Sequence, residues 1–356
     1  MHILKSLSSP VTIGNGPLET FDFSQYAAST YVIITDNNVA SIAGTALQTR
    51  LAKAGLPVEL IVFPAGEASK SLTKAEELLG LLAEKNIDRD ALLIALGGGV
   101  VGDLVGFIAS IYKRGIRYVQ VPTTLVAQLD SSIGAKTAVN LHAGKNLAGT
   151  TYPPMAIVTD PSVLASLAER EVRGGLAEAI KYGAIWDASL FEFITDNIRS
   201  PGAAFYEDLV LKCAKIKIEI TDKDPEEKEF RKILNFGHTV GHALEIASNH
   251  ELSHGEAIAW GMLAEARISL MLNLLSIDDL RRLQELIKRL QPPKLPAFKS
   301  SDLIKLMKRD KKSKAGLLYF VLLSSIGSVR QENGTVAFPV DAEVVRKSLS
   351  ELAGTR

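Results

Sequence analysis

Four of the six histidines in this chain lie between positions 238 and 254. If the segment that leads into them forms one helix, its polar side chains share a single face, at Arg231, Asn235, His238, His242 and Glu245. Apolar residues flank this stripe, which predicts that it points into a cavity where polar groups are paired or coordinate an ion. The alternative is a helix edge on which the histidines are incidental.

Histidines four residues apart on a helix can bind one metal ion. No glutamate follows the first of them directly, so the pattern differs from the HExxH motif and a carboxylate ligand must come from elsewhere. Glu178 is the candidate, because it lies in an otherwise apolar helical segment with Lys181 on the same face. His254 is a candidate third ligand. Three protein ligands would leave a position open to a substrate oxygen.

A glycine-rich turn at 97–103 (GGGVVGD) follows an apolar strand and opens an apolar helix. Such a turn lets backbone N–H groups approach a pyrophosphate, although tight packing alone would also explain it. Asp36 ends an earlier strand and can bind ribose hydroxyls or form a plain Asx-turn. Thr123 and Thr124 follow another strand end, at the same predicted edge of the sheet.

Basic residues suggest that part of the ligand is anionic. Lys136 and Lys145 stand beside glycine and serine turns, which favours contacts to phosphate, although a solvated surface lysine is the alternative for each. Further positive charge comes from Lys217, Arg231, Lys311 and Lys312.

The first part of the chain alternates predicted strands, at 31–35, 58–63, 91–96 and 117–121, with helices at 40–54 and 71–85. This order predicts a parallel, doubly wound α/β sheet. Later segments are helical, apart from one short strand at 317–323; the helices are expected at 164–184, 205–221, 230–249, 255–272 and 277–290. We therefore expect an α/β nucleotide-binding domain at 1–160 and an all-α domain at 161–356 that binds metal and substrate.

Composition argues against several other classes of protein. Forty Lys and Arg residues balance forty Asp and Glu residues, so nucleic acid is not the expected partner. The single cysteine, Cys213, forms no internal disulfide and is predicted to be buried. We see no secretory signal, and the apolar stretch 91–112 contains a glycine turn and Asp103, which argues against a membrane span. We predict a cytoplasmic protein.

Several segments together carry a family resemblance: GGGVVGD, YKRG, VPTTLVAQLDSSIGAKTAVN, GKNLAG, GGLAEAIKYG, LNFGHTVGHALE, HGEAIAWGM and DKK. In order and spacing they resemble the 3-dehydroquinate synthase family of sugar phosphate cyclases, from about residue 30 to about residue 330. The combination of DSS and GKN with GHT, GHA and HG is the most specific part of the match.

The resemblance implies a lyase of the shikimate pathway that converts 3-deoxy-D-arabino-heptulosonate 7-phosphate into 3-dehydroquinate and phosphate. NAD would accept a hydride and return it within each turnover, with phosphate elimination between the two transfers and an intramolecular aldol closure at the end. A divalent metal, zinc or cobalt, would be bound by Glu178, His238 and His254. His242 would be a proton-transfer group and not a ligand.

The resemblance also assigns the remaining residues. Other catalytic roles would belong to Lys181, Asn235 and Glu227. NAD would contact Asp36, Glu67, Lys70, Gly98, Gly99, Val100, Gly102, Asp103, Thr123, Thr124 and Lys145. The phosphorylated sugar acid would contact Asp130, Lys136, Asn146, Lys217, Arg231 and Lys312, with Arg114 reaching its phosphate across a homodimer interface.

The sequence departs from the family pattern at three places. Ala135 and Ala138 replace glycines, which matters where φ is positive or a ligand is close. The segment before Arg231 reads Glu227-Lys-Glu-Phe where the family tends to have Glu-x-Gly, and Thr151-Tyr152 replaces a segment centred on Phe.

Three other functions stay open. A related cyclase would make a different carbocycle, but Lys217 and Arg231 favour the dehydroquinate reaction, because relatives often alter the anion pocket. A metal-dependent polyol dehydrogenase would accumulate NADH, whereas the cyclase would not. An inactive NAD-binding scaffold would have no need of the complete set of Glu178, His238 and His254.

Overall fold

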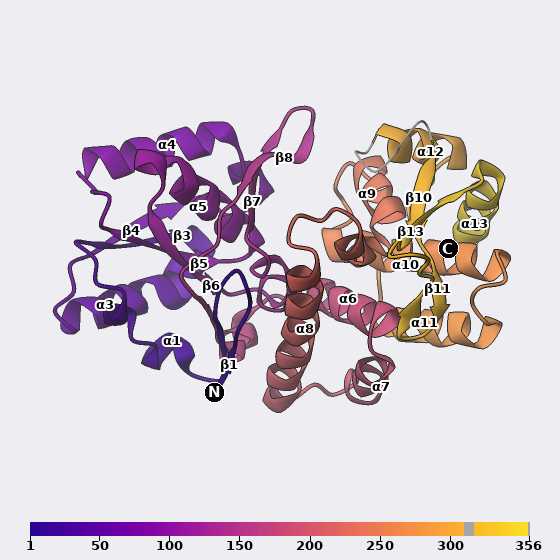
Figure 1. The fold of residues 1–356 in the computed structure, drawn as a ribbon, viewed down its shortest axis with the longest axis horizontal. Helices are drawn as coiled ribbons and strands as arrows, with labels where there is room; N and C mark the ends of the chain where they lie inside the picture. Colours follow the sequence, from indigo (N-terminus) through magenta and orange to yellow (C-terminus); the bar gives the residue numbers. More distant parts are fainter. Residues whose placement is uncertain (310–316, 355–356) are drawn as a thin grey trace. The chain divides into compact units, whose positions relative to one another are not determined.

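The computed structural model describes residues 1–309 and 317–354, so Lys311 and Lys312 lie outside the described part of the chain. The chain divides into two compact units (Figure 1). Unit 1 contains Met1–Ala168 and Tyr206–Asp222, and unit 2 contains Glu169–Phe205 and Lys223–Arg356. The functional division into 1–160 and 161–356 stays a prediction, because a compact unit does not by itself say what it binds.

Unit 1 is built on a seven-stranded sheet with the strand order β1-β2-β9-β6-β5-β3-β4. Every neighbouring pair is parallel except β1 and β2. The strands are β1 (His2–Leu4), β2 (Val11–Ile13), β3 (Tyr31–Asp36), β4 (Val58–Phe63), β5 (Leu92–Gly97), β6 (Arg117–Pro122) and β9 (Ile157–Thr159). A separate antiparallel hairpin consists of β7 (Lys136–Leu141) and β8 (Gly144–Thr151).

Helices cover both faces of this sheet, which confirms the predicted doubly wound α/β fold (Figure 1). On one face Leu47 of α3 packs in a cluster with Ile94 of β5, and on the other Leu78 of α4 packs in a cluster with Leu93. Burial on both sides explains why β5 is apolar at every position instead of alternating. The helices of unit 1 are α1 (Pro17–Thr20), α2 (Asn37–Val39), α3 (Thr45–Lys53), α4 (Leu72–Glu84), α5 (Gly99–Ile111) and most of α8 (Ala203–Lys223).

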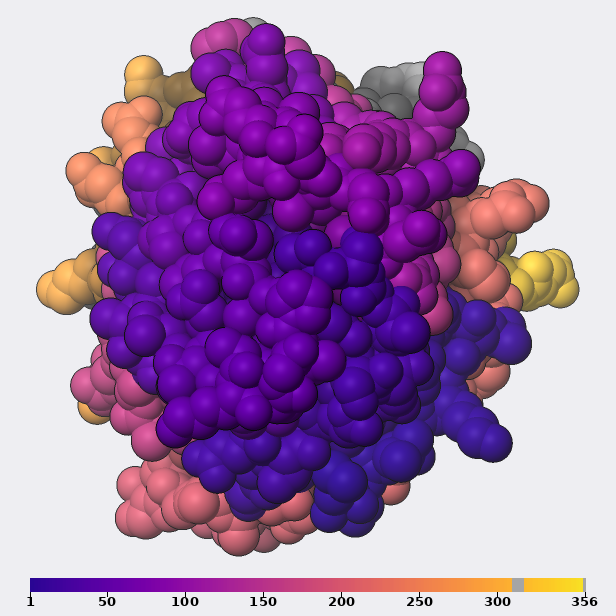
Figure 2. All heavy atoms as spheres, turned by 90° about the vertical axis from the view of Figure 1, so that its left-hand side faces the viewer, coloured from indigo at the N-terminus to yellow at the C-terminus, as the bar shows by residue number. Residues whose placement is uncertain are grey.

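The N-terminal part of the chain forms most of the surface of unit 1 that Figure 2 turns toward the viewer. Cys213 lies on α8 and is buried, as predicted. Within the described ranges, no helix is both long enough and apolar enough to cross a lipid bilayer.

Unit 2 is mainly helical, and its central helix is α10, which is buried over most of its length. α6, α9, α11 and α13 pack against it. The helices are α6 (Glu169–Ile185), α7 (Ala188–Asn197), α9 (His238–Ala247), α10 (His254–Met271), α11 (Ile277–Arg289), α12 (Ser300–Arg309) and α13 (Ala342–Gly354). The late strand predicted at 317–323 belongs to two small ribbons, which pair β10 (Leu318–Val321) with β13 (Ala337–Val340) and β11 (Leu323–Ser325) with β12 (Ser328–Val329).

The prediction of one continuous helix over 230–249 is wrong. Phe230–Asn235 is a 3₁₀ turn, Phe236 is extended, and Gly237 has φ of +80° before α9 begins at His238. A left-handed residue cannot continue a right-handed helix, so the five-residue polar stripe is broken in the middle. Only its second half, at His238, His242 and Glu245, shares a helix face.

Candidate metal centre and nucleotide-binding turn

Three side chains of unit 2 present possible metal ligands to a common point. Glu178 comes from the middle of α6, His238 is the first residue of α9, and His254 is the first residue of α10. One ligand atom from each of the three lies within 4.8 Å of the others. Glu178 precedes both histidines by 60 or more positions in the sequence. The packing of α6 and α9 on α10 brings the three residues together.

Glu178 is a buried carboxylate shared by several cationic or potentially cationic groups. Its Oε1 lies 3.2 Å from Nε2 of His254 and 3.5 Å from Nε2 of His238, and its Oε2 lies 2.5 Å from Nζ of Lys181. Burial opposes ionisation, but the charge of Lys181 and the hydrogen bond from His254 outweigh it and hold the pKa of Glu178 well below the usual range. The side chain of Glu178 is therefore ionised at neutral pH, as a carboxylate that could hold a cation must be.

The imidazole of His238 is held by a hydrogen bond at Nδ1, and its Nε2 is the nitrogen that faces Glu178. Its Nδ1 lies 3.1 Å from the carbonyl oxygen of Phe236, which can only accept, so Nδ1 carries the proton. Burial lowers the pKa of His238 well below its ordinary value, and the nearby Lys181 lowers it further, although Glu178 acts in the opposite direction. A neutral ring with one nitrogen fixed by a carbonyl is the usual state of a histidine that binds a metal.

His254 lies between two carboxylates. Its Nε2 faces Oε1 of Glu178, while its Nδ1 lies 3.6 Å from Oε2 of Glu245. Burial lowers the pKa of His254, but its hydrogen bonds to Glu178 and Glu245 raise it to about 9. The ring is therefore protonated in the metal-free protein at neutral pH, and a cation that binds Nε2 takes the place of a proton.

His242 lies beside this group without being part of it. Its ring centroid is 5.4 Å from that of His238 and 5.9 Å from that of His254. The four-residue spacing of His238 and His242 therefore pointed to α9, which carries one of the three residues that can hold an ion. The second histidine of that set is His254, from α10. The proton-transfer role expected for His242 stays a prediction.

A loop that ends in the 3₁₀ turn carries Arg231 and Glu227. The carboxylate of Asp224 organises it by accepting hydrogen bonds from the backbone nitrogens of Lys228, Glu229 and Arg231, at 2.9–3.0 Å. Arg231 is 4% exposed and donates from Nη1 to the carbonyl of Pro225. Glu227 has φ of +56°, which is uncommon for a residue with a side chain. Sequence reasoning did not single out Asp224.

The glycine turn of unit 1 has the expected strand-to-helix geometry. β5 ends at Gly97, Gly98 caps the helix in an extended conformation, and α5 begins at Gly99. The first N–H groups of α5 have no partners within the helix, and such groups bind phosphate oxygens in many proteins. Val100, Gly102 and Asp103 lie in the first turns of this helix.

Four of the residues assigned to NAD or substrate form a connected polar cluster in unit 1. Nζ of Lys70 lies 2.5 Å from Oδ2 of Asp103 and 2.6 Å from Oδ1 of Asn146. Asn140 links this group to Glu67, because its Nδ2 donates to Glu67 and its Oδ1 accepts from the backbone nitrogen of Asn146. Burial raises the pKa of Asp103, and Lys70 counteracts that rise. The first and last residues of this cluster, Glu67 and Asn146, are more than 70 positions apart in the sequence, and the fold brings them close together.

Other residues of unit 1 that were assigned to ligands differ in their contacts and exposure. Asp36 caps α2 by accepting from the nitrogens of Asn38 and Val39, so it does form the Asx-type turn that was the alternative to ribose binding. Lys217 is 7% exposed and pairs with Asp130. The exposed side chains are Lys136, Lys145 and Arg114, and Arg114 has φ of +64°.

Two models of the 3-dehydroquinate synthase family match this chain, the N-terminal one over residues 60–174 and the C-terminal one over residues 175–313. The chain belongs to the 3-dehydroquinate synthase family. It is 44% identical to the 3-dehydroquinate synthase of Caldanaerobacter subterraneus subsp. tengcongensis over 83% of this chain and 85% of that protein. It is 42% identical to that of Desulforamulus reducens over 92% of this chain and 93% of that protein.

Solved structures of other cyclases share the fold of this 3-dehydroquinate synthase family member. A 2-deoxy-scyllo-inosose synthase complexed with carbaglucose-6-phosphate, NAD⁺ and Co²⁺ is 28% identical, with a TM-score of 0.91 over 98% of this chain and 100% of that one. The 2-epi-5-epi-valiolone synthase of Streptomyces hygroscopicus subsp. jinggangensis, with NAD⁺ and Zn²⁺ bound, is 29% identical, with a TM-score of 0.87 over 100% and 99%. Iron-containing alcohol dehydrogenases at 14% identity share the fold alone.

One departure from the family pattern lies at a strained backbone position. Ala135, which replaces a glycine, has φ of +60° and is 6% exposed. An alanine in this conformation is strained by its Cβ, whereas glycine is not. Ala138 is in β7 and is not among the residues with positive φ.

One residue next to the candidate ligands, Glu245, could not be assigned a partner from the sequence. Glu245 was part of the predicted stripe, but its role as a partner of His254 depends on the start of α10, which the spacing within α9 does not reveal.

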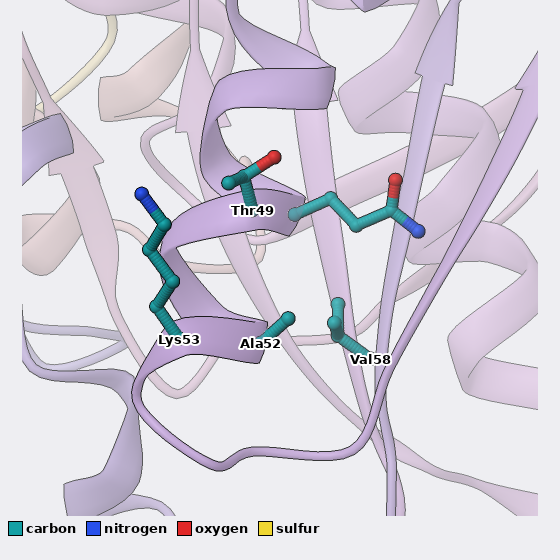
Figure 3. Close-up of a pocket in the computed structure, with 5 residues that line it drawn as sticks. Thr49, Ala52, Lys53 and Val58 are labelled. Carbon is teal, nitrogen blue, oxygen red and sulfur yellow. The ribbon is translucent and has the colours of Figure 1, made fainter.

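A pocket in unit 1 is lined by Gln48, Thr49, Ala52, Lys53 and Val58, from α3 and the start of β4 (Figure 3). None of these residues was assigned to a ligand.

Proposed function

We propose that this chain converts 3-deoxy-D-arabino-heptulosonate 7-phosphate into 3-dehydroquinate and phosphate, as a lyase of the shikimate pathway that uses NAD and a divalent metal. The observation that carries the proposal is the grouping of Glu178, His238 and His254 within 4.8 Å, in a chain that both family models match. The identity of 40–44% to curated 3-dehydroquinate synthases supports the choice of this cyclase over those related at 28–29%.

The three ligand residues fit a zinc or cobalt ion by their chemistry. One ionised carboxylate and two imidazoles are donors that both metals accept, and three protein ligands leave room for substrate oxygens. When bound, the ion supplies positive charge that polarises hydroxyl groups of the substrate. Lys181 holds the carboxylate of Glu178 in its ionised form, and Phe236 and Glu245 orient the two rings.

The glycine turn fits a dinucleotide. In the described part of the chain, the buried hydroxyls of Thr123 and Ser131 have no hydrogen-bond partner, and both residues follow β6, the neighbour of β5. NAD would supply a reversible hydride acceptor, so that no net oxidation occurs. We assign its binding to Asp36, Glu67, Lys70, Gly98, Gly99, Val100, Gly102, Asp103, Thr123, Thr124 and Lys145.

The remaining assigned residues bind and orient the substrate or move protons. Lys217, Arg231 and Lys136 are cations suited to its phosphate and carboxylate, while Asp130, Asn146 and Asn235 hold hydroxyl groups. Much of the catalysis is then orientation, because elimination and the aldol closure both require a fixed conformation of the substrate. We assign proton transfer to His242, with Glu227 as a second candidate.

We further propose that the enzyme is a cytoplasmic homodimer. The assignment of Arg114 to the phosphate of a neighbouring active site requires a second copy of the chain. Cys213 is buried and is the single cysteine, so the fold does not depend on an oxidising compartment.

The test is an assay of the metal-free protein with 3-deoxy-D-arabino-heptulosonate 7-phosphate, catalytic NAD and added Zn²⁺ or Co²⁺. The proposal predicts equal amounts of phosphate and 3-dehydroquinate, and no NADH beyond the amount of enzyme. A panel of other sugar phosphates separates the related cyclases. Phosphate release from one of those substrates alone, or steady accumulation of NADH with a polyol, would refute the proposal.

A further inference from the structure

Glu265 is a buried carboxylate to which none of the roles above gives a task. It lies on α10 and is 0% exposed. Its Oε2 accepts a hydrogen bond of 2.8 Å from the backbone nitrogen of Gly237, and its Oε1 accepts one of 3.2 Å from that of Val240. A carboxyl group is unfavourable in a protein interior unless hydrogen bonds replace those it makes to water, and the two backbone N–H groups provide such bonds.

The two bonds cap α9 from outside that helix. The first N–H groups of a helix have no partner within it, and the side chain of the N-cap residue usually accepts from the third helical position. In α9 the N-cap is Gly237, which has no side chain, and the third position is Val240. Glu265 therefore supplies from α10 the acceptor that a serine or aspartate supplies in other helices.

The close approach of the two helices explains why the cap comes from α10. Gly237 has φ of +80°, and a Cβ there would lie 2.6 Å from Cγ of Met262 and 3.1 Å from the carbonyl oxygen of Ile258. A Cβ on Gly261 would lie 2.0 Å from the carbonyl oxygen of Gly237. Glu265 follows Gly261 by one helical turn on the same face, so it reaches the turn that has no room for a side chain of its own.

The capped turn immediately precedes a residue of the metal centre. His238 follows Gly237, and its Nδ1 is fixed by Phe236 on the other side of the same turn. The helix that carries Glu265 begins at His254. One carboxylate thus joins the start of α9 to the helix that presents the second histidine.

We propose that Glu265 is a positioning residue of the metal centre, which holds Nε2 of His238 at the place where it, Glu178 and His254 can bind one ion. The inference rests on the proposed function, because it takes these three residues as the ligands. A purely structural role would lower stability alone. A positioning role also weakens metal binding by the folded protein, and changes to such supporting contacts typically cost about 10- to 100-fold in metal affinity.

The test compares Glu265→Gln with the wild-type protein. The amide keeps the size of the side chain but can accept through only one oxygen, and its NH₂ group faces a backbone N–H. We expect zinc affinity, measured against a competing chelator, to fall about 10- to 100-fold. We also expect the visible spectrum of the Co²⁺-loaded variant to change, because it reports ligand geometry, while NAD binding is unchanged.

Ser348→Ala is the matched control. It removes a buried hydrogen bond of 2.7 Å from Ser348 Oγ to the carbonyl of Ala264. Ala264 is the neighbour of Glu265 on α10, but this hydrogen bond does not involve α9. Its zinc affinity and cobalt spectrum should equal those of the wild type. An equal loss of affinity in both variants, or a wild-type affinity and spectrum in Glu265→Gln, would overturn the inference.

A measurement on the wild-type protein covers the case in which Glu265→Gln does not fold. Native-state hydrogen exchange should place the amides of Gly237 and Val240 among the slowest of unit 2, with and without Zn²⁺. Fast exchange of either amide would refute the cap. A wild-type protein that binds no zinc would instead refute the metal centre of the proposed function, and the two failures are therefore distinguishable.

Discussion

Lys181 and Glu178 form an ion pair one turn apart on α6, with Nζ 2.5 Å from Oε2 and only 2% of either side chain exposed. Removal of Lys181 would leave the buried charge of Glu178 compensated by the imidazole rings alone, which lie 3.2 and 3.5 Å from its Oε1. In this site a metal cation at Oε1 would supply part of the missing positive charge. If the proposed metal centre binds an ion, the pair therefore links the stability of unit 2 to metal binding.

We predict that Lys181→Met lowers the free energy of unfolding of the metal-free protein by about 3–5 kcal/mol. Added Zn²⁺ should raise the melting temperature of the variant more than that of the wild type, because the ion then neutralises Glu178. Thermal unfolding with and without zinc measures both effects. Lys228→Met is the control, since Lys228 and its partner Glu226 are mostly exposed and should change little. Equal stability of metal-free Lys181→Met and wild type would contradict the prediction.

The pKa of about 9 for His254 predicts how the metal-free protein responds to pH. The pKa is raised above the ordinary 6.5, so the contribution of the protonated ring to stability is complete below that value and is lost as pH rises through about 9. A metal ion must displace this proton, so zinc affinity should rise over the same range.

At pH 7 we expect the uptake of each Zn²⁺ to release about one proton from His254, since the pKa of His238 is lowered and Glu178 is ionised. Calorimetric titrations in buffers of different ionisation enthalpy measure this number. The same titration at pH 10 should show much less release. Proton release that is absent at pH 7, or independent of pH, would show that His254 is not protonated before the metal binds.

The strain at Ala135 predicts a stabilising substitution. Glycine adopts φ of +60° without the steric cost of a Cβ, although it gives the unfolded chain more freedom. We expect Ala135→Gly to increase the free energy of unfolding by up to about 1 kcal/mol. Ala138→Gly, in the neighbouring strand without positive φ, should instead decrease it. Denaturant titration compares the two, and the same sign for both would argue against strain at Ala135.

The ion pair of the buried Lys217 with the half-buried Asp130 provides a test of the anion assignment. We predict that Lys217→Ala weakens binding of the phosphorylated substrate by about 1.5–3 kcal/mol, as expected for loss of a charged hydrogen bond. NAD affinity should be unchanged. Lys215→Ala, on the exposed side of the same helix, should alter neither. Calorimetry of each ligand measures the effects, and equal losses for substrate and NAD would contradict the assignment.

The four central strands β3, β4, β5 and β6 could be predicted from the sequence because their signals are local, whereas the short strands β1, β2 and β9 were not predicted. The apolar run of β5, the glycines that follow it and the alternation of strand and helix patterns depend on neighbouring residues only. For the same reason, the spacing of His238 and His242 pointed to α9, although of these two only His238 belongs to the candidate metal-binding group.

The contacts around the metal centre could not be predicted in this way. Gly237 interrupts a segment whose periodicity is otherwise helical, and its left-handed conformation depends on packing against Met262 and Ile258. The local pattern around Glu265 does not signal its capping role, because the backbone N–H groups of Gly237 and Val240 that it accepts from belong to a distant part of the sequence. Glu245 was visible as a polar residue, but not as the partner of His254.

The most direct test of the metal centre is an anomalous diffraction map from crystals of the protein grown with Co²⁺. We expect a single strong peak within coordination distance of Oε1 or Oε2 of Glu178, Nε2 of His238 and Nε2 of His254. Crystals of Glu178→Ala should lack the peak while they keep the fold of unit 2. A peak at other residues, or the same peak in Glu178→Ala, would contradict the account.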